Sequence, residues 1–205
     1  LCNRLFGKSP VSNISKQISN LLFLADTKKF NILKCPTQKS YPLSFAQERL
    51  FFICEFDSHA NSAYNVPVLL KLSKLDFNFD LLYKSFIDLI KRHEILRTLI
   101  YEDVENSNEL RQFIIDENQI NELFVCYQEI SENITEMDIK LSKLLDLEFN
   151  LRKEIPIKVF VHENKEDDDL FFYVCILFHH ICFDGWSYPI FIRDLEHIFM
   201  SFNEN

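Results

Sequence analysis

The sequence predicts an α+β, or mixed α/β, fold in which helices flank a mixed sheet. Segments with the two-residue repeat of strands are mixed with segments that have the helical repeat, but the two kinds do not alternate strictly, as they do in a doubly wound sheet. One uninterrupted apolar run, Leu170–Phe178, is typical of a strand buried on both faces. Apolar residues make up 47% of the 205 residues, which is enough for a substantial core.

The first forty residues are expected to form a connector rather than a packed element. Residues 1–40 are mostly polar and end among prolines. The domain itself is therefore expected to cover residues 41–205. Its first helix is predicted over 45–55, because Ser44 precedes Gln47 by three residues, the spacing of a capping box.

The elements of the middle of the chain are predicted from periodicity. Apolar residues alternate from Val66 to Leu72, which predicts a strand with one buried face, and Pro67 places that strand at a sheet edge or at its own start. A helical repeat over Phe79–His93 predicts an amphipathic helix. The segments Arg97–Glu102 and Glu109–Asp116 flank a polar stretch and predict a hairpin.

The second half of the chain is expected to contain three further strands and two further helices. The last helix includes Pro189, which is tolerated in a first helical turn. In chain order, we expect a strand at 124–128, a helix at 136–147, strands at 155–161 and 170–178, and a helix through 191–202.

Charge excludes some classes of partner. The formal net charge is -9 and no basic stripe is present, whereas nucleic acids and anionic membranes are bound through clustered Lys and Arg. Charged residues interrupt every apolar stretch before it reaches the ~20 residues of a membrane span, and no basic-then-apolar leader opens the chain. We therefore expect a cytoplasmic protein with a small-molecule or protein partner.

The cysteines predict reduced thiols. They show neither a CxxC pair nor metal-ligand spacing, and a chain of this size does not need a disulfide framework. One of them, Cys182, lies in the segment discussed next and is a candidate nucleophile, but no positive neighbour is evident that would lower its pKa. The six residues are Cys2, Cys35, Cys54, Cys126, Cys175 and Cys182.

Two adjacent histidines end the long apolar run and begin the segment HHICFDGWS, residues 179–187. Because side chains alternate along a strand, His179 and His180 point to opposite faces, and one of them can face a cleft. The segment lies between a strand and a helix, where backbone N–H groups can face a developing negative charge. A metal site of both histidines and Asp184 is disfavoured, because the histidines point apart and no further ligand is near in the sequence.

Three segments resemble motifs of one enzyme family, in the same order along the chain. SFAQERL at 44–50 (the first motif) is similar to SxAQxR(L/M), RHEILRT at 92–98 (the second motif) to RHExLRT, and HHICFDGWS (the third motif) to HHxxxDG. These are motifs of the condensation domains of nonribosomal peptide synthetases, which belong to the chloramphenicol acetyltransferase-like superfamily. The resemblance runs from about Pro42 to the last helix, so residues 41–205 resemble the N-terminal lobe, and the C-terminal lobe is expected to be absent.

The resemblance implies peptide-bond formation. A carrier-bound aminoacyl amine attacks a carrier-bound donor acyl or peptidyl thioester, with no metal, nucleotide or cofactor bound by the domain itself. The implied partners are donor and acceptor peptidyl carrier proteins with their phosphopantetheine arms, the C-terminal lobe, and a neighbouring adenylation domain. Two alternatives stay open: an acyl-CoA-dependent acyltransferase of the same superfamily, and a non-catalytic fragment that docks carrier proteins.

The resemblance also assigns roles to the histidines. His180 is expected to bind and orient the attacking amine or to accept its proton, and the choice between these two roles stays open. An α-amine titrates near ~7.7–8.0 and an imidazole near ~6.5, so that proton transfer is feasible at neutral pH. His179 is expected to be a supporting residue.

Further supporting residues follow from the same resemblance. Asp184 is expected to hold the third motif through an ion pair with Arg97, chosen over Arg92, and the alternative role for Asp184 is a helix cap. Gly185 is expected to let the backbone approach substrate and to offer its N–H to an oxyanion, and the alternative is a plain turn glycine. The other motif residues are expected to be structural: Gln47, Arg49, His93, Trp186 and Ser187.

Overall fold

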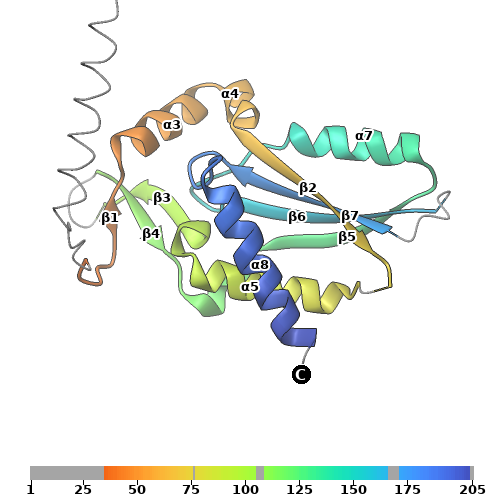
Figure 1. The fold of residues 1–205 in the computed structure, drawn as a ribbon. Coiled ribbons are helices and arrows are strands. Elements are labelled where there is room, and N and C mark those ends of the chain that lie inside the picture. The colour runs from red at the N-terminus through yellow and green to blue at the C-terminus, as the bar shows by residue number, and fades with distance from the viewer. Residues whose placement is uncertain (1–34, 76, 105–108, 166–170, 204–205) are drawn as a thin grey trace, which may run out of the picture. The chain divides into compact units, whose positions relative to one another are not determined.

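In this computed structural model, the helices of the domain pack around a four-stranded mixed sheet (Figure 1). The structure describes residues 35–75, 77–104, 109–165 and 171–203. The strand order is β2-β7-β6-β5. β7 pairs antiparallel with both of its neighbours, and β5 pairs parallel with β6. The strands are β2 (Asn65–Ser73), β5 (Val125–Ser131), β6 (Ile157–Asn164) and β7 (Phe171–His179).

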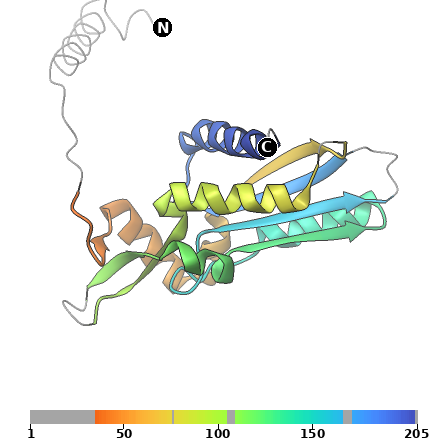
Figure 2. The same cartoon turned by 90° about the horizontal axis from the view of Figure 1, so that it is seen from below.

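Helices cover both faces of this sheet (Figure 2). α5 (Phe79–Arg92) and α8 (Ser187–Asn203) pack on one face, and α7 (Ile134–Leu145) packs on the other. The central strand β7 therefore has both faces buried, as its uninterrupted apolar sequence predicted. Pro67 predicted either a sheet edge or a strand start for its strand, and β2 lies at one edge of the sheet with Pro67 near its first residue.

A small second sheet stands apart from the main one. It has the order β1-β4-β3, and the predicted hairpin forms two of its strands. The sequence did not show that the hairpin would pair with a short strand near its own start rather than extend the mixed sheet. The strands are β1 (Tyr41–Pro42), β3 (Thr98–Glu102) and β4 (Leu110–Ile114).

The first predicted helix is confirmed and so is its cap. The backbone N–H of Gln47 donates to Ser44 Oγ at 3.3 Å, and the Ser44 N–H donates to Gln47 Oε1 at 2.9 Å. The other helices within the described ranges were either predicted, with ends shifted by a few residues, or too short to have a periodicity. In the part of the chain that the structure describes, the helical elements not yet given are α3 (Phe45–Phe56), α4 (Ser58–Ala63), η1 (Glu94–Arg97), η2 (Glu117–Gln119) and α6 (Ile120–Leu123).

The predicted connector lies mostly outside the described residues. The chain divides between Thr37 and Gln38 into two units, and the second unit, Gln38–Asn205, contains both sheets. Of the predicted 1–40 segment, residues 1–34 are not described. None of the helices in the described ranges is both long enough and apolar enough to cross a membrane.

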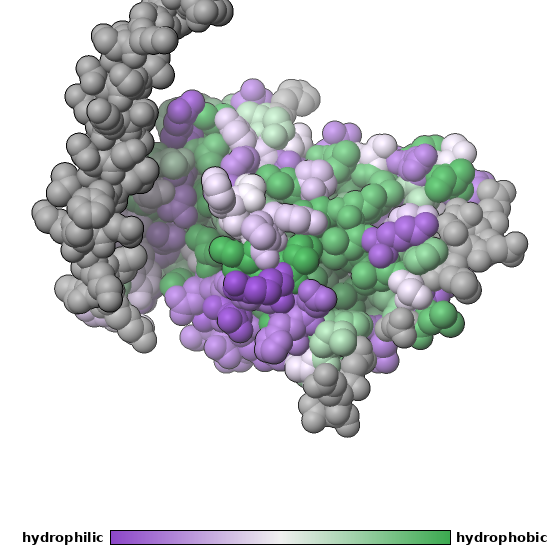
Figure 3. Space-filling view, in the orientation of Figure 1, coloured by the Kyte–Doolittle hydropathy of each residue, from purple (hydrophilic) through white to green (hydrophobic). Residues whose placement is uncertain are grey.

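Apolar side chains reach the surface beside α8. A hollow of about 340 Å³ lies between β2 and α8, and its lining includes Leu70, Leu72, Ile192 and Phe199. Figure 3 shows hydrophobic side chains gathered over this part of the face, next to hydrophilic ones. Part of the surface of this unit is therefore an exposed apolar patch.

Candidate active site

The third motif forms the turn that joins β7 to α8 at one end of the main sheet (Figure 1). β7 ends at His179 and α8 begins at Ser187, so the predicted strand-to-helix junction is confirmed. The backbone N–H of His180 donates to the carbonyl of Tyr64 at 2.8 Å, which ties the turn to the start of β2. The turn is thus held from the sheet side.

His179 is fully buried beneath this turn. Its Nδ1 accepts a hydrogen bond from the Ile181 N–H at 3.1 Å, and its Nε2 lies 3.5 Å from Cys54 Sγ. Burial, followed by the charge of the neighbouring His180, lowers the pKa of His179 to about 4. A neutral, enclosed imidazole of this kind can hold the turn in place but has no access to a substrate.

His180 has the opposite environment. Its side chain is exposed and lines an open hollow of about 460 Å³ between the turn and the first helical turn of α3. Ser44, Gln47 and Leu50 of the first motif line the same hollow. The fold therefore brings the first and third motifs to one place, although more than a hundred residues separate them in the sequence.

Asp184 caps α8 instead of pairing with an arginine. Its carboxylate accepts hydrogen bonds from Ser187 N–H at 2.9 Å and Ser187 Oγ at 2.7 Å. These bonds, the side-chain one first, lower the pKa of Asp184, and the charge of His180 adds to the effect. The alternative role considered for Asp184, a helix cap, is the one observed.

The ion pair expected between Asp184 and Arg97 is therefore wrong. Arg97 is buried at the end of η1, where its guanidinium donates to the carbonyl of Ile115 and lies 3.5 Å from Glu94. This places Arg97 at the hairpin, whereas Asp184 is exposed at the start of α8. Arg92 does not reach Asp184 either, since it pairs with Asp194.

The second motif is joined to α8 by a buried carboxylate that sequence reasoning missed. Asp194 is 5% exposed and lies 3.0 Å from His93 Nε2 and 3.2 Å from Arg92 Nε. Arg193 contacts its other oxygen at 2.9 Å. An acid within the buried stripe of an amphipathic helix, between Phe191 and Leu195, is the signal that could have found it.

Gly185 lies beside a second hollow, on the β2 side of the turn. This hollow has a volume of about 440 Å³ and is lined by β2 residues together with Phe183, Asp184, Gly185 and Tyr188. A methyl group added at Gly185 would meet no atom within 4 Å. The fold of this chain therefore does not itself require glycine here, and the space in front of the backbone is open.

A comparison with known families decides what this arrangement is. Residues 37–205 match the family model described as Condensation domain. The chain belongs to the condensation-domain family. This confirms the resemblance that the three motifs indicated.

Relatives of this condensation domain are parts of peptide synthetases. The N-(5-amino-5-carboxypentanoyl)-L-cysteinyl-D-valine synthase of Amycolatopsis lactamdurans is 33% identical over 154 residues, 75% of this chain and 4% of that protein. The dimodular nonribosomal peptide synthase of Bacillus subtilis is 30% identical over 193 residues, 94% of this chain and 7% of that protein. The chain thus spans a small fraction of the relatives it matches.

A solved structure confirms the fold. The starter condensation domain of rhizomide synthetase superposes with a TM-score of 0.66 at 13% identity, over 82% of this chain and 40% of that chain. The mixed α/β architecture predicted from the sequence is therefore that of condensation domains.

The thiols of this condensation domain are poorly suited to nucleophilic attack. Cys182 Sγ lies 3.2 Å from the His179 carbonyl, and burial raises the pKa of its thiol far above its usual range. Burial also raises the pKa of Cys54 and of Cys175 to about 11. Cys182 is thus held as a neutral thiol, which argues against the nucleophile considered from sequence. Within the described ranges, no three His, Cys, Asp or Glu side chains gather as metal ligands.

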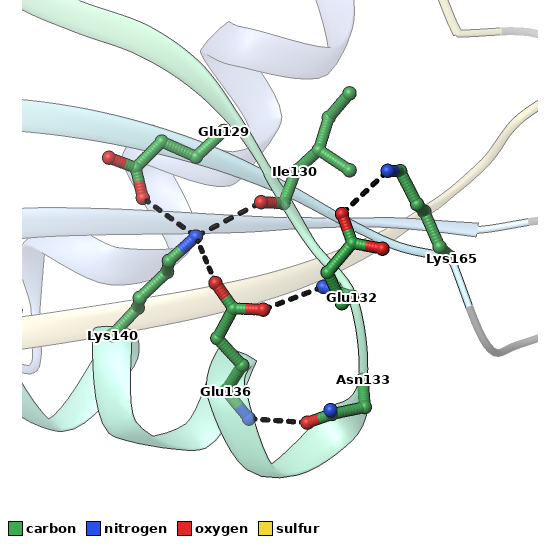
Figure 4. Close-up of polar contacts among 7 residues, drawn as sticks. All are labelled: Glu129, Ile130, Glu132, Asn133, Glu136, Lys140 and Lys165. Atoms are coloured by element: carbon green, nitrogen blue, oxygen red, sulfur yellow. Dashed lines mark hydrogen bonds and ion pairs between the residues drawn. The ribbon is translucent and has the colours of Figure 1, made fainter.

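A cluster of charged side chains lies at the other end of the sheet, where β5 leads into α7 (Figure 4). Lys140 Nζ lies 3.0 Å from Glu136, 3.8 Å from Glu129 and 3.0 Å from the Ile130 carbonyl. Asn133 caps the helix by accepting from the Glu136 N–H at 2.9 Å. These paired charges hold the start of α7 against β5. None of the contacts of this cluster given above involves a residue of the third motif.

Proposed function

We propose that this chain is the N-terminal lobe of a condensation domain that forms a peptide bond between two carrier-bound substrates. The α-amine of an acceptor aminoacyl group attacks the carbonyl carbon of a donor acyl or peptidyl thioester. An amide bond forms, the C–S bond breaks, and the proton lost by nitrogen goes, directly or through a base, to the leaving pantetheine thiolate. The observation that carries the proposal is the His180 side chain, exposed in a hollow between the first and third motifs.

His180 orients the amine and accepts its proton in this proposal. A positioned general base typically supplies ~10²–10⁴ in rate, whereas holding two reactants in register is worth effective molarities of ~10⁵–10⁸ M. Positioning is therefore the larger contribution. His179 supports His180 from the interior, Asp184 supports it by capping α8, and the backbone at Gly185 is open to a close approach by substrate.

Two hollows adjoin the turn, and two substrates have to meet there. The hollow with His180 is bounded by α3, and the second is bounded by β2. Both are lined by Phe183 and Asp184, so the third motif forms the wall between them. This supports an approach of donor and acceptor arms from opposite sides of the turn.

The proposed partners follow from the family. They are donor and acceptor peptidyl carrier proteins, the C-terminal lobe of the same domain and a neighbouring adenylation domain. The phosphopantetheine arms of the carriers hold the substrates, and we propose that the domain binds no cofactor of its own. The matched solved condensation domain is more than twice as long as the part this chain covers, which supports a second lobe. The cytoplasmic location predicted from the sequence stays a prediction.

The test is dipeptide formation by a complete two-lobed domain that includes this chain, supplied with loaded donor and acceptor carriers. We expect His180→Ala to lower the rate at least ~10²-fold, the lower range for loss of a general base. His197→Ala is the matched control, since His197 is exposed on α8 and lines neither hollow. Undiminished product from His180→Ala would overturn the assignment.

Two further arms separate the alternatives. Turnover of a free amine with a soluble acyl-CoA, without carriers, would identify an acyl-CoA-dependent acyltransferase. Carrier binding without any product from the parent domain would identify a docking fragment. Either result would overturn the proposed condensation.

A further inference from the structure

A buried thiol–imidazole contact joins α3 to the turn that carries His180. Cys54 Sγ lies 3.5 Å from His179 Nε2, within the distance of a hydrogen bond to sulfur. Cys54 is 8% exposed and His179 is 0% exposed, so water does not reach this contact easily. The contact spans 125 residues and connects the helix of the first motif with the strand end of the third.

The hydrogen bonds of His179 determine where its proton is. The backbone N–H of Ile181 can only donate, and it donates to His179 Nδ1 at 3.1 Å. Nδ1 is therefore unprotonated, and a neutral imidazole then carries its proton on Nε2. The Nε2–H needs an acceptor in a buried site, and Cys54 Sγ is the atom within reach.

The position of this ring controls the backbone of the turn. The Ile181 N–H is held by the ring itself, and the Cys182 N–H is held by the His179 carbonyl at 3.1 Å. The rings of Tyr64 and Phe149 lie beside the imidazole, with centroids 6.4 and 5.9 Å away. Rotating the imidazole would release the Ile181 N–H, next to the residue on which the proposed chemistry depends.

We propose that Cys54 is a positioning residue for the proposed condensation reaction: by accepting the Nε2–H of His179, it fixes the ring that holds the turn bearing His180. The proposal rests on the function proposed above for its catalytic consequence. The thiol is not itself a reactant. It acts as a weak acceptor in a place where an unpaired N–H would be costly.

The first measurement uses the 205-residue chain and does not depend on activity. Long-range ¹H–¹⁵N spectra of the chain labelled at histidine nitrogens are expected to show His179 as the Nε2–H tautomer, with an Nε2 proton protected from solvent exchange. His179→Gln assigns the signal. Cys54→Ala should accelerate exchange of that proton at least about tenfold, because its acceptor is lost, whereas Cys54→Ser should keep it protected.

Cys175→Ala is the matched control. Cys175 is 4% exposed and lies on β7, four residues before His179, where its side chain packs in the apolar core. Its removal should therefore leave the His179 signals unchanged. Unchanged exchange in Cys54→Ala, an Nδ1–H tautomer in the parent chain, or an equal effect of Cys175→Ala would each overturn the proposal.

The second measurement is dipeptide formation by the complete domain. Cys54→Ala should lower kcat roughly tenfold with KM nearly unchanged, less than the ~10²–10⁴ expected for a general base. Cys54→Ser should restore kcat to within about twofold, since a hydroxyl also accepts. An unchanged kcat in Cys54→Ala would overturn the positioning role. Failure of the proposed function itself would give a different result: the parent domain would form no dipeptide even though His179 shows the expected spectrum.

Discussion

Protonation of buried His179 should make the stability of this domain depend on pH. The imidazole is fully buried, its Nδ1 is occupied by the Ile181 N–H, and its pKa is lowered from 6.5 to about 4. Between these two values the unfolded chain binds a proton at this residue and the folded chain does not. Stability therefore falls as pH decreases from above 6.5 toward 4.

The size of the effect follows from the shift. At pH 5, the histidine is protonated in the unfolded chain and neutral in the folded chain. The free energy of unfolding decreases over the interval from the unfolded pKa of 6.5 down to pH 5, which is about 1.5 pH units. At about 1.36 kcal/mol per unit, this is a loss of about 2 kcal/mol relative to pH 7.5. Carboxylates with lowered pKa values, such as Asp184 and Asp194, lose their contribution only at still lower pH.

Urea unfolding of the chain at pH 7.5 and pH 5 measures this difference. His179→Gln, which cannot be protonated, should lose about 2 kcal/mol less than the parent between the two pH values. His162, a second buried histidine with a lowered pKa, contributes to both proteins and cancels. His197→Gln should behave like the parent. If His179→Gln and the parent lose the same free energy, His179 is not held neutral in the folded domain.

Two further predictions concern the turn and α8. Gly185→Ala should leave the free energy of unfolding within about 0.5 kcal/mol of the parent, because the added methyl meets no atom. Dipeptide formation by the complete domain should fall, because the methyl occupies space through which substrate is proposed to approach. A loss of stability or an unchanged rate would contradict this prediction. Asp194→Ala should cost about 1–3 kcal/mol in urea unfolding, since Arg92 and His93 lose their shared acceptor. Glu196→Gln, on the same helix but exposed, should change stability by less than about 0.5 kcal/mol, and an equal loss in both variants would contradict the reasoning.

The secondary structure was largely readable from the sequence because its signals are local. The capping box at Ser44 and Gln47 is made by residues three apart, and the helical repeat of α5 arises within fourteen residues. The apolar run of β7 likewise indicated a strand with two covered faces. Short elements such as α4 and η1 escaped, because four to six residues do not establish a period.

The site was readable only in part. The motifs located His179 and His180 at a strand end, and alternation along the strand indicated that they would face different environments. The predicted ion pair of Asp184 with Arg97 was wrong, because a carboxylate three residues before the start of a helix has its nearest hydrogen-bond donors in that helix. Asp194 went unnoticed because two of its partners, Arg92 and His93, lie about a hundred residues earlier in the chain, at the end of α5.

The sequence by itself determined the longer helices and strands, the uncharged character of β7 and the family to which the three motifs point. Only the tertiary structure decided which histidine is buried and what each charged side chain contacts. The physical reason is the sequence separation of the interacting residues: helix caps, helical repeats and strand alternation depend on residues that are close along the chain. Contacts such as Cys54 with His179 depend on how α3 and β7 pack, and no local pattern encodes that distance.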